Sequence, residues 1–159
     1  MATQKQLNDA RTVYGAFCRV LDGNGWQYVR DDNKLTVALT VKGKDLPMEI
    51  FAGIDAARML ISIYSKPGFT VPEEKMVDMA VAVAASNWGM VDGSFDYSLS
   101  DGNLIFRMAE SYRDSMIGDE LLSYMLGVVC GTVDRYNDRF LMLCKGTLSL
   151  GDFLAEERT

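Results

Sequence analysis

The chain has 159 residues, 48% of them hydrophobic, and a formal net charge of −6. That length predicts one domain, spanning residues 1–159, with a core that needs no metal or disulfide support. The excess of acidic side chains argues against nucleic acid as a partner, because phosphate binding needs a basic surface. It argues equally against insertion at an anionic membrane surface. A basic or apolar protein partner remains compatible with this charge.

Histidine is absent, and the three cysteines, Cys18, Cys130 and Cys144, are widely spaced. Without histidine, the usual Ser–His–Asp and Cys–His catalytic groups and most zinc and iron sites are excluded. The cysteine spacing fits no disulfide framework, so we expect buried thiols in a reducing compartment. The polar start lacks a signal segment, and the most apolar run, 121–133, is shorter than the roughly 20 residues that cross a bilayer. We therefore expect a cytoplasmic protein.

Residues 3–21 carry apolar side chains at three- and four-residue steps, which predicts a helix with one buried face. A Gly- and Asn-containing run at 22–25 ends this helix, because both residues readily form left-handed caps. Residues 26–41 alternate polar and apolar side chains, which predicts a β-hairpin with a turn at Asp32-Asn33. In that register the apolar cross-strand pairs are Trp26 with Leu39 and Tyr28 with Val37.

Two further strands are expected at 46–52 and 58–64, joined by a turn at 53–56. One face of this pair carries Met48, Ile50, Met59, Ile61 and Ile63. The other face carries Glu49, Phe51, Leu60, Ser62 and Tyr64. Because the pair is apolar on both faces, it has to be covered on both sides, by its own chain or by a partner.

A second helix is predicted from Pro72 to Trp88, since proline suits the first helical position. Residues 94–108 then form a second hairpin, with a two-residue turn at Asp101-Gly102. In that register Leu99 faces Leu104, Tyr97 faces Phe106, Phe95 faces Met108, and Asp96 lies opposite Arg107.

A third helix is expected over 119–136, with 138–145 either a separate helix or its continuation, and a short last helix begins after Ser149. Together these elements predict an α+β fold, an antiparallel sheet with helices packed on it, in the order helix–strands–helix–hairpin–helix. Gly127 and Gly131 lie inside the third helix. We expect them to permit close packing of that helix on the sheet.

The candidate sites are few. Asp31-Asp32-Asn33 has the oxygen ligands of a calcium or magnesium site but lacks the further ligands of a calcium loop, which favours a solvated turn. A two-carboxylate hydrolase using Asp92 and Asp96 stays open, although nothing distinguishes these acids from surface groups. We expect no catalytic, cofactor-binding or metal-binding residue.

The strongest candidate is an apolar stripe of Phe51, Leu60 and Tyr64. If helices cover the opposite face of the sheet, these residues form a homodimer or partner surface. The alternative is that the terminal helices cover them.

Several short motifs resemble the YbjN family, described as putative bacterial sensory transduction regulators, whose fold is similar to that of type III secretion chaperones. The motifs are Trp26-x-Tyr28, Val71-Pro72-Glu73, Asn87, the run from Gly93-x-Phe95 through Asp101-Gly102 to Phe106-Arg107, and Asp134-Arg135-Tyr136. The resemblance implies a non-enzymatic, dimeric, cytoplasmic protein and provides no catalytic residues.

The expected function is therefore a protein-binding module, dimeric and regulatory or chaperone-like, that acts through apolar surface. A dedicated type III secretion chaperone, which wraps an unfolded segment along apolar strips and edge strands, is one alternative. A small-ligand sensor or carboxylate-based enzyme is the other.

Overall fold

The computed structural model describes residues 1–158, and within them one six-stranded antiparallel sheet is flanked by helices. The helices are α1 (Gln4–Gly23), the 3₁₀ turn η1 (Glu73–Lys75), α2 (Met76–Trp88), α3 (Asp119–Lys145) and α4 (Leu150–Glu157). The strands are β1 (Val29–Asp31), β2 (Thr36–Lys42), β3 (Pro47–Asp55), β4 (Leu60–Lys66), β5 (Ser94–Tyr97) and β6 (Leu104–Ser111). Their order across the sheet is β1-β2-β3-β4-β6-β5. The predicted α+β fold is confirmed.

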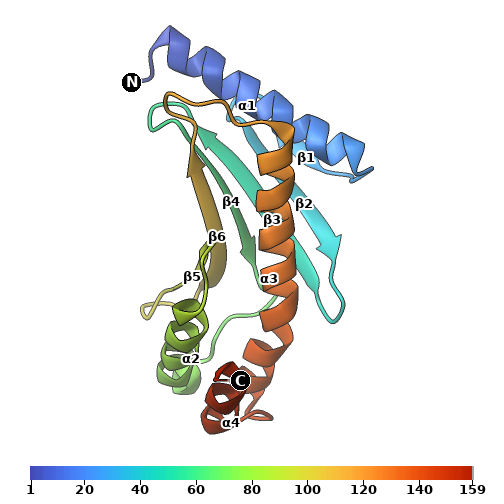
Figure 1. Ribbon diagram of the computed structural model, residues 1–159. Coiled ribbons are helices and arrows are strands. Elements are labelled where there is room, and N and C mark those ends of the chain that lie inside the picture. The colour runs from blue at the N-terminus through green and yellow to red at the C-terminus, as the bar shows by residue number, and fades with distance from the viewer. Residues whose placement is uncertain (159) are drawn as a thin grey trace.

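The helices lie against one face of the sheet (Figure 1). Helix α3 runs across β3, β4 and β6, while α1 crosses near one end and α2 packs beside β5. The covered strand residues are buried, as the alternation predicts: Ile50, Ile61, Ile63 and Phe106 are fully inaccessible to solvent. Burial of such side chains is the main favourable term in folding. Among residues 1–158, no helix lies on the other face of the sheet (Figure 1).

Helix boundaries follow local capping chemistry. Thr3 caps α1 in a reciprocal capping box with Gln6, and the Ser149 hydroxyl accepts from the backbone N–H of Asp152 at the start of α4. Residues 138–145 continue α3 as one helix, which ends at Gly146 in the left-handed conformation (φ 72°). The second helix is the least regular: its predicted first turn is η1, and the α-helix begins only at Met76.

The four hairpins of the sheet close through four-residue loops, and Lys42 pairs with Pro47 across the β2–β3 loop. This corrects the two-residue turns predicted at Asp32-Asn33 and Asp101-Gly102, and it moves the turn predicted at 53–56 to 56–59. Asp31 pairs with Thr36, Asp55 with Leu60, and Tyr97 with Leu104, with Ser98 and Asn103 joined by a further backbone bond. Strand β3 accordingly continues to Asp55 instead of ending at Ala52. The registers of the first and last hairpins are each displaced by two residues from those predicted.

A displacement of two residues keeps every side chain on its predicted face, because strand side chains alternate with a period of two. Phe95 therefore still lies on the covered face but pairs with Phe106 rather than Met108. Leu99 falls in the loop and is 64% exposed. In the first hairpin Arg30, not Tyr28, pairs with Val37, and Trp26 precedes the strand.

The last residue of three of these loops has a positive φ: Leu35 (53°), Met59 (54°) and Gly102 (69°). This conformation disfavours residues with a Cβ atom. Leu35 and Met59 are both buried in the core, which offsets the strain. The carboxylates of Asp31 and Asp55, just before two of the loops, accept bonds from loop N–H groups.

The motif residues of the sequence analysis act as joints between elements. The Asn87 side chain donates to the carbonyl of Phe95 (2.9 Å) and accepts from its N–H (2.8 Å). The Asp134 carboxylate accepts from the backbone N–H of Lys44 (2.6 Å), which fixes the β2–β3 turn against α3. These hydrogen bonds connect neighbouring elements of the fold and do not assemble a reactive centre.

Candidate functional site

One row of side chains crosses the open face of the sheet from edge to edge. The strand registers align Val29, Ala38, Phe51, Tyr64, Arg107 and Ser94. Phe51 and Tyr64 occupy the two central strands of this row, on β3 and β4. In the described part of the chain no helix covers this face, so α1 and α4 do not bury the predicted stripe.

Phe51 and Tyr64 are stacked, with ring centroids 5.2 Å apart and planes inclined by 19°. Both side chains are half-buried. Small residues, Ala38, Gly53 and Ser62, lie next to them on this face, and two shallow hollows result. One, of about 310 Å³, lies over Ala38 and Gly53, and the other, of about 430 Å³, lies between Phe51 and residues 27–29. Aromatic pairs of this kind favour offset or tilted contacts with further rings.

Leu60 shares the face but lies apart from the ring pair. It pairs with Asp55 at the end of β4, four residues before Tyr64, or about 13 Å along the strand. Ser62 lies between them, so the stripe is an aromatic pair plus a separate leucine. Val29, which was not among the predicted surface residues, is 75% exposed in the same row. Its alternation with Tyr28 was the available signal.

Charged side chains border this surface without forming a reactive cluster. Arg107, next to Tyr64, pairs with Asp96 at 2.6 Å, which confirms the predicted ion pair although the two residues are not directly opposite. Asp92 accepts a hydrogen bond from Tyr124. The two candidate hydrolase carboxylates therefore each serve another protein group.

Asp31 and Asp32 are engaged within the first hairpin loop. Asp32 accepts from Arg30 (2.7 Å) and from the Tyr14 hydroxyl (3.0 Å), and these two bonds lower the pKa of its carboxyl. Burial, followed by the bond to Asp32, raises the pKa of Tyr14. The network ties α1 to the loop. Within residues 1–158, no three of the carboxylates and thiols come together as a metal-binding group.

The two edges of the sheet differ. At one edge, Asn87 bonds both backbone groups of Phe95 on β5, so that part of the edge is occupied. At the other, β1 pairs only with Thr36–Ala38 of β2. In the described chain, residues 39–42 of β2 therefore have no strand on their outer side. Unpaired edges of this kind accept an added strand.

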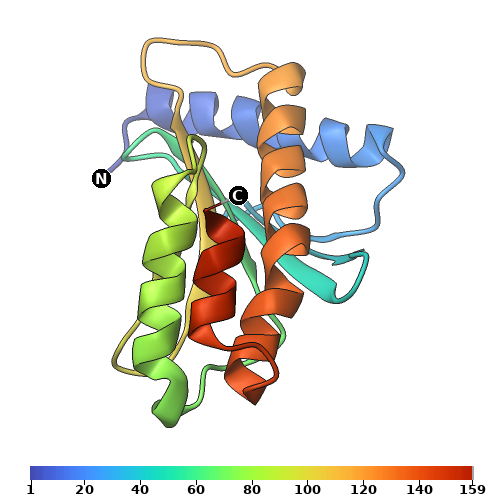
Figure 2. The same cartoon turned by 60° about the horizontal axis from the view of Figure 1, so that its bottom comes forward.

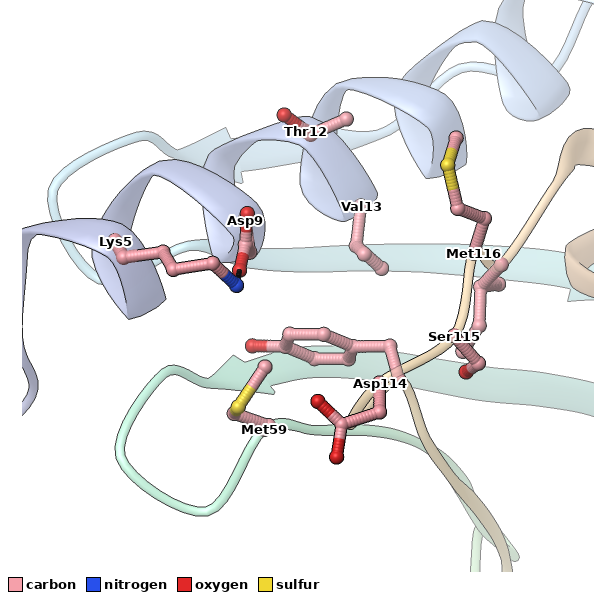
Figure 3. A pocket seen from close by; sticks show the side chains of 10 residues that line it. Lys5, Asp9, Thr12, Val13, Met59, Asp114, Ser115 and Met116 are labelled. Atoms are coloured by element: carbon pink, nitrogen blue, oxygen red, sulfur yellow. Dashed lines mark hydrogen bonds and ion pairs between the residues drawn. The ribbon is translucent and has the colours of Figure 1, made fainter.

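A separate recess of about 340 Å³ lies between α1 and the loop 112–117 (Figure 3). Val13 and Met59 form apolar wall, and Met116 lines one side. On α1, Lys5 and Asp9 form an ion pair at 3.1 Å at its rim. The recess has an apolar interior and a polar rim but brings no nucleophile and base together.

The cysteines are free thiols on helices, Cys18 buried and the other two half-buried. Burial raises the pKa of Cys130 to about 11, which leaves it protonated and unreactive near neutral pH. No helix in the described part of the chain is long and apolar enough to cross a membrane.

Solved structures similar to this chain share its fold. "Crystal structure of YbjN, a putative transcription regulator from E. coli" aligns with a TM-score of 0.57 and 11% identity, over 78% of this chain and 87% of that one. "Structure of the HopA1-SchA Chaperone-Effector Complex" aligns with a TM-score of 0.55 and 11% identity, over 82% of this chain and 95% of that one. "Crystal Structure of the ExsC-ExsE Complex" aligns with a TM-score of 0.56 and 11% identity, over 80% of this chain and 95% of that one.

No curated protein matches the chain in sequence. The family model of YbjN, "Putative bacterial sensory transduction regulator", matches residues 16–142, which is most of the chain. This range contains the whole sheet, the Asn87 joint and the Phe51–Tyr64 pair. The chain therefore belongs to the YbjN family and has the fold shared with secretion chaperones.

Proposed function

We propose that this protein is a non-enzymatic, cytoplasmic protein-binding regulator that acts as one domain and dimerises through the open face of its sheet. The observation that carries the proposal is the stacked Phe51–Tyr64 pair, which is half-exposed on a face without helices. Exposed apolar patches of this kind mark protein interfaces. The family and the chaperone-like neighbours support a protein-binding role.

A second copy of the chain fits this surface. In a twofold dimer the same patch meets itself, so the rings of one subunit face the hollows beside the rings of the other. Small residues at the floor of the hollows, Ala38 and Gly53, leave room for such rings. The flanking Arg107 is already neutralised by Asp96, so the charge directly across from Tyr64 is satisfied within the chain. Glu49 and Lys66 lie opposite each other at one side of the ring pair and carry charges of opposite sign.

Light scattering on the purified full chain tests the dimer. We expect about twice the monomer mass of 17.7 kDa at micromolar concentrations. Leu60→Asp and Tyr64→Asp are expected to give the monomer mass with the fold intact. Val77→Asp is the matched control, since Val77 is 74% exposed on α2 and its replacement should leave the dimer unchanged.

Two results would contradict this proposal. A wild-type mass of one monomer across the micromolar range would exclude the dimer. Loss of the circular-dichroism signal in Leu60→Asp would mean that Leu60 supports the core instead of an interface. Tyr64→Asp then decides between the two readings, because it changes the centre of the patch.

A dedicated secretion chaperone is the second candidate, favoured by the unpaired outer side of residues 39–42 on β2. An extended client segment could add there as a strand, with a side chain in the adjoining hollow of about 430 Å³. Affinity capture from native lysate, read by mass spectrometry, distinguishes the two candidates. One predominant secreted client supports the chaperone, whereas recovery of the chain alone supports the dimeric regulator.

A further inference from the structure

A groove of about 490 Å³ runs between the C-terminal half of α2 and the middle of α3. Its α2 side is lined by Ala85, Ser86 and Trp88, and its α3 side by Gly127, Gly131 and Arg135. Helix α4 lies between α2 and α3 (Figure 2), and its last residue, Glu157, lines one end of the groove. The groove therefore continues the cleft that α4 already fills.

Gly127 and Gly131 have no packing partner in the described chain. We expected them to bring α3 close to the sheet, but both are exposed, and a Cβ atom at either position would meet nothing within 4 Å. Neither residue has a positive φ. A glycine inside a helix costs about 1 kcal/mol relative to alanine. Their effect here is to leave the floor of the groove open to another backbone.

The walls of the groove carry the residue types that dominate binding energy at interfaces. Trp88 is 92% exposed at the end of α2. Arg135 is exposed on α3, with its guanidinium 5.5 Å from the Tyr136 ring, and within residues 1–158 it makes no ion pair. A partner bound here would cover the tryptophan and supply a carboxylate to the arginine.

The occupied part of the cleft indicates what kind of segment fits. There α4 inserts Phe153, fully buried and stacked against Phe140 with centroids 5.5 Å apart. Glu157 pairs with Arg139 at 2.6 Å, and Arg139 lies over the Phe153 ring. Arg139 is one helical turn beyond Arg135, and both guanidinium groups approach Tyr136. Arg135 and Arg139 thus approach the same tyrosine ring in the same way, but only Arg139 has a carboxylate partner.

From this repetition we infer that the groove binds an amphipathic helix of a protein partner, which packs on Gly127 and Gly131 and presents a carboxylate to Arg135. The distance from Gly127 to Arg135 is eight residues, or about 12 Å, which accommodates roughly two helical turns. The site lies on the helical side of the molecule and is independent of the sheet face proposed for dimerisation.

A fluorescent peptide with the sequence of residues 147–158 is the probe, because it is the acidic amphipathic helix that this cleft already accepts. Fluorescence anisotropy measures its binding to the full chain. Gly131→Leu, which fills the groove, is expected to weaken binding at least 10-fold. Asn8→Leu, an uncharged change at an exposed position of α1, should change affinity less than 2-fold.

Charge reversal provides the second arm. Arg135→Glu is expected to weaken binding at least 10-fold, and a peptide with Glu156→Lys and Glu157→Lys should recover most of that loss on this variant. Trp88 emission should shift on binding, and Trp88→Phe should abolish the shift. Thermal melts of each variant verify that the fold is kept, which is expected because leucine favours helix more than glycine does.

Absence of binding up to millimolar peptide, or affinities unaffected by Gly131→Leu and Arg135→Glu, would overturn the inference. The second pattern would mean that the peptide replaces α4 in its own part of the cleft. Leu60→Asp separates the two proposals, because it should abolish the dimer while leaving peptide affinity within 2-fold.

Discussion

The Asn87 bridge offers a direct test of how α2 is attached to the edge of the sheet. The variant Asn87→Ala removes two hydrogen bonds, of 2.9 and 2.8 Å, to the backbone of Phe95. Phe95 is only 6% exposed. Each such bond contributes about 1 kcal/mol net, and a buried backbone group left unpaired adds about 1–3 kcal/mol. Removing the amide leaves space into which water can enter and bond the two backbone groups in part, so we expect a total loss of roughly 2–4 kcal/mol.

Urea unfolding followed by circular dichroism measures this loss. With a slope of about 2 kcal/mol per molar, the midpoint should fall by roughly 1–2 M. Asn8→Ala is the matched control, because it makes the same substitution in an exposed turn of α1, where the amide bonds only another exposed side chain. If the two variants unfold within about 0.5 kcal/mol of each other, the bridge does not stabilise the edge strand.

Three further predictions follow from the geometry. Gly102→Ala should lower stability by more than about 1 kcal/mol in the same assay, since the residue has a φ of 69° and a Cβ atom would lie 2.5 Å from a backbone oxygen; Gly23→Ala, which meets nothing, should not. Arg139→Met should speed hydrogen exchange in α4 but not in β4, because it removes the ion pairs to Glu156 and Glu157 while keeping an apolar side chain over the Phe153 ring. Equal exchange in α4 of wild type and variant would refute the role of these ion pairs. Because the pKa of the Asp32 carboxyl is lowered in the folded protein, the ionised carboxylate stabilises the fold above about pH 4, and this contribution disappears as the pH falls through the pKa of the folded state. Asp32→Asn should therefore lower the melting temperature at pH 7 more than at pH 3. An equal difference in melting temperature between wild type and variant at the two pH values would contradict this.

The motif residues through which the sequence resembles the YbjN family have structural roles in the fold. Asn87 joins α2 to β5, Asp134 fixes the β2–β3 turn, and Gly102 lies against the backbone of Val71. The contacts of Asn87 and Asp134 need those particular side chains, and the contact of Gly102 leaves no room for a side chain. Function is then expected at surfaces the fold leaves open, and the two proposals above concern such surfaces.

The hairpins show where sequence reasoning stops. The alternation of side chains placed every strand residue on the correct face, yet two registers were displaced by two residues. A period of two cannot distinguish these alternatives, and the choice depends on loop length. In the first hairpin the loop ends at Leu35, which adopts a conformation that favours glycine and which the core sustains by burying its side chain. In the last hairpin Gly102 adopts the same conformation.

By itself the sequence determined where the helices lie, the two faces of β3 and β4, the ion pair of Asp96 with Arg107 and the absence of histidine chemistry, because these depend on local periodicity and composition. It left open whether 138–145 continues the third helix. Tertiary structure alone decided which face stays open, that Phe51 and Tyr64 stack while Leu60 lies apart, and that the α3 glycines face a groove. These features arise from contacts between residues distant in the chain, and such contacts leave no periodic signal in one sequence.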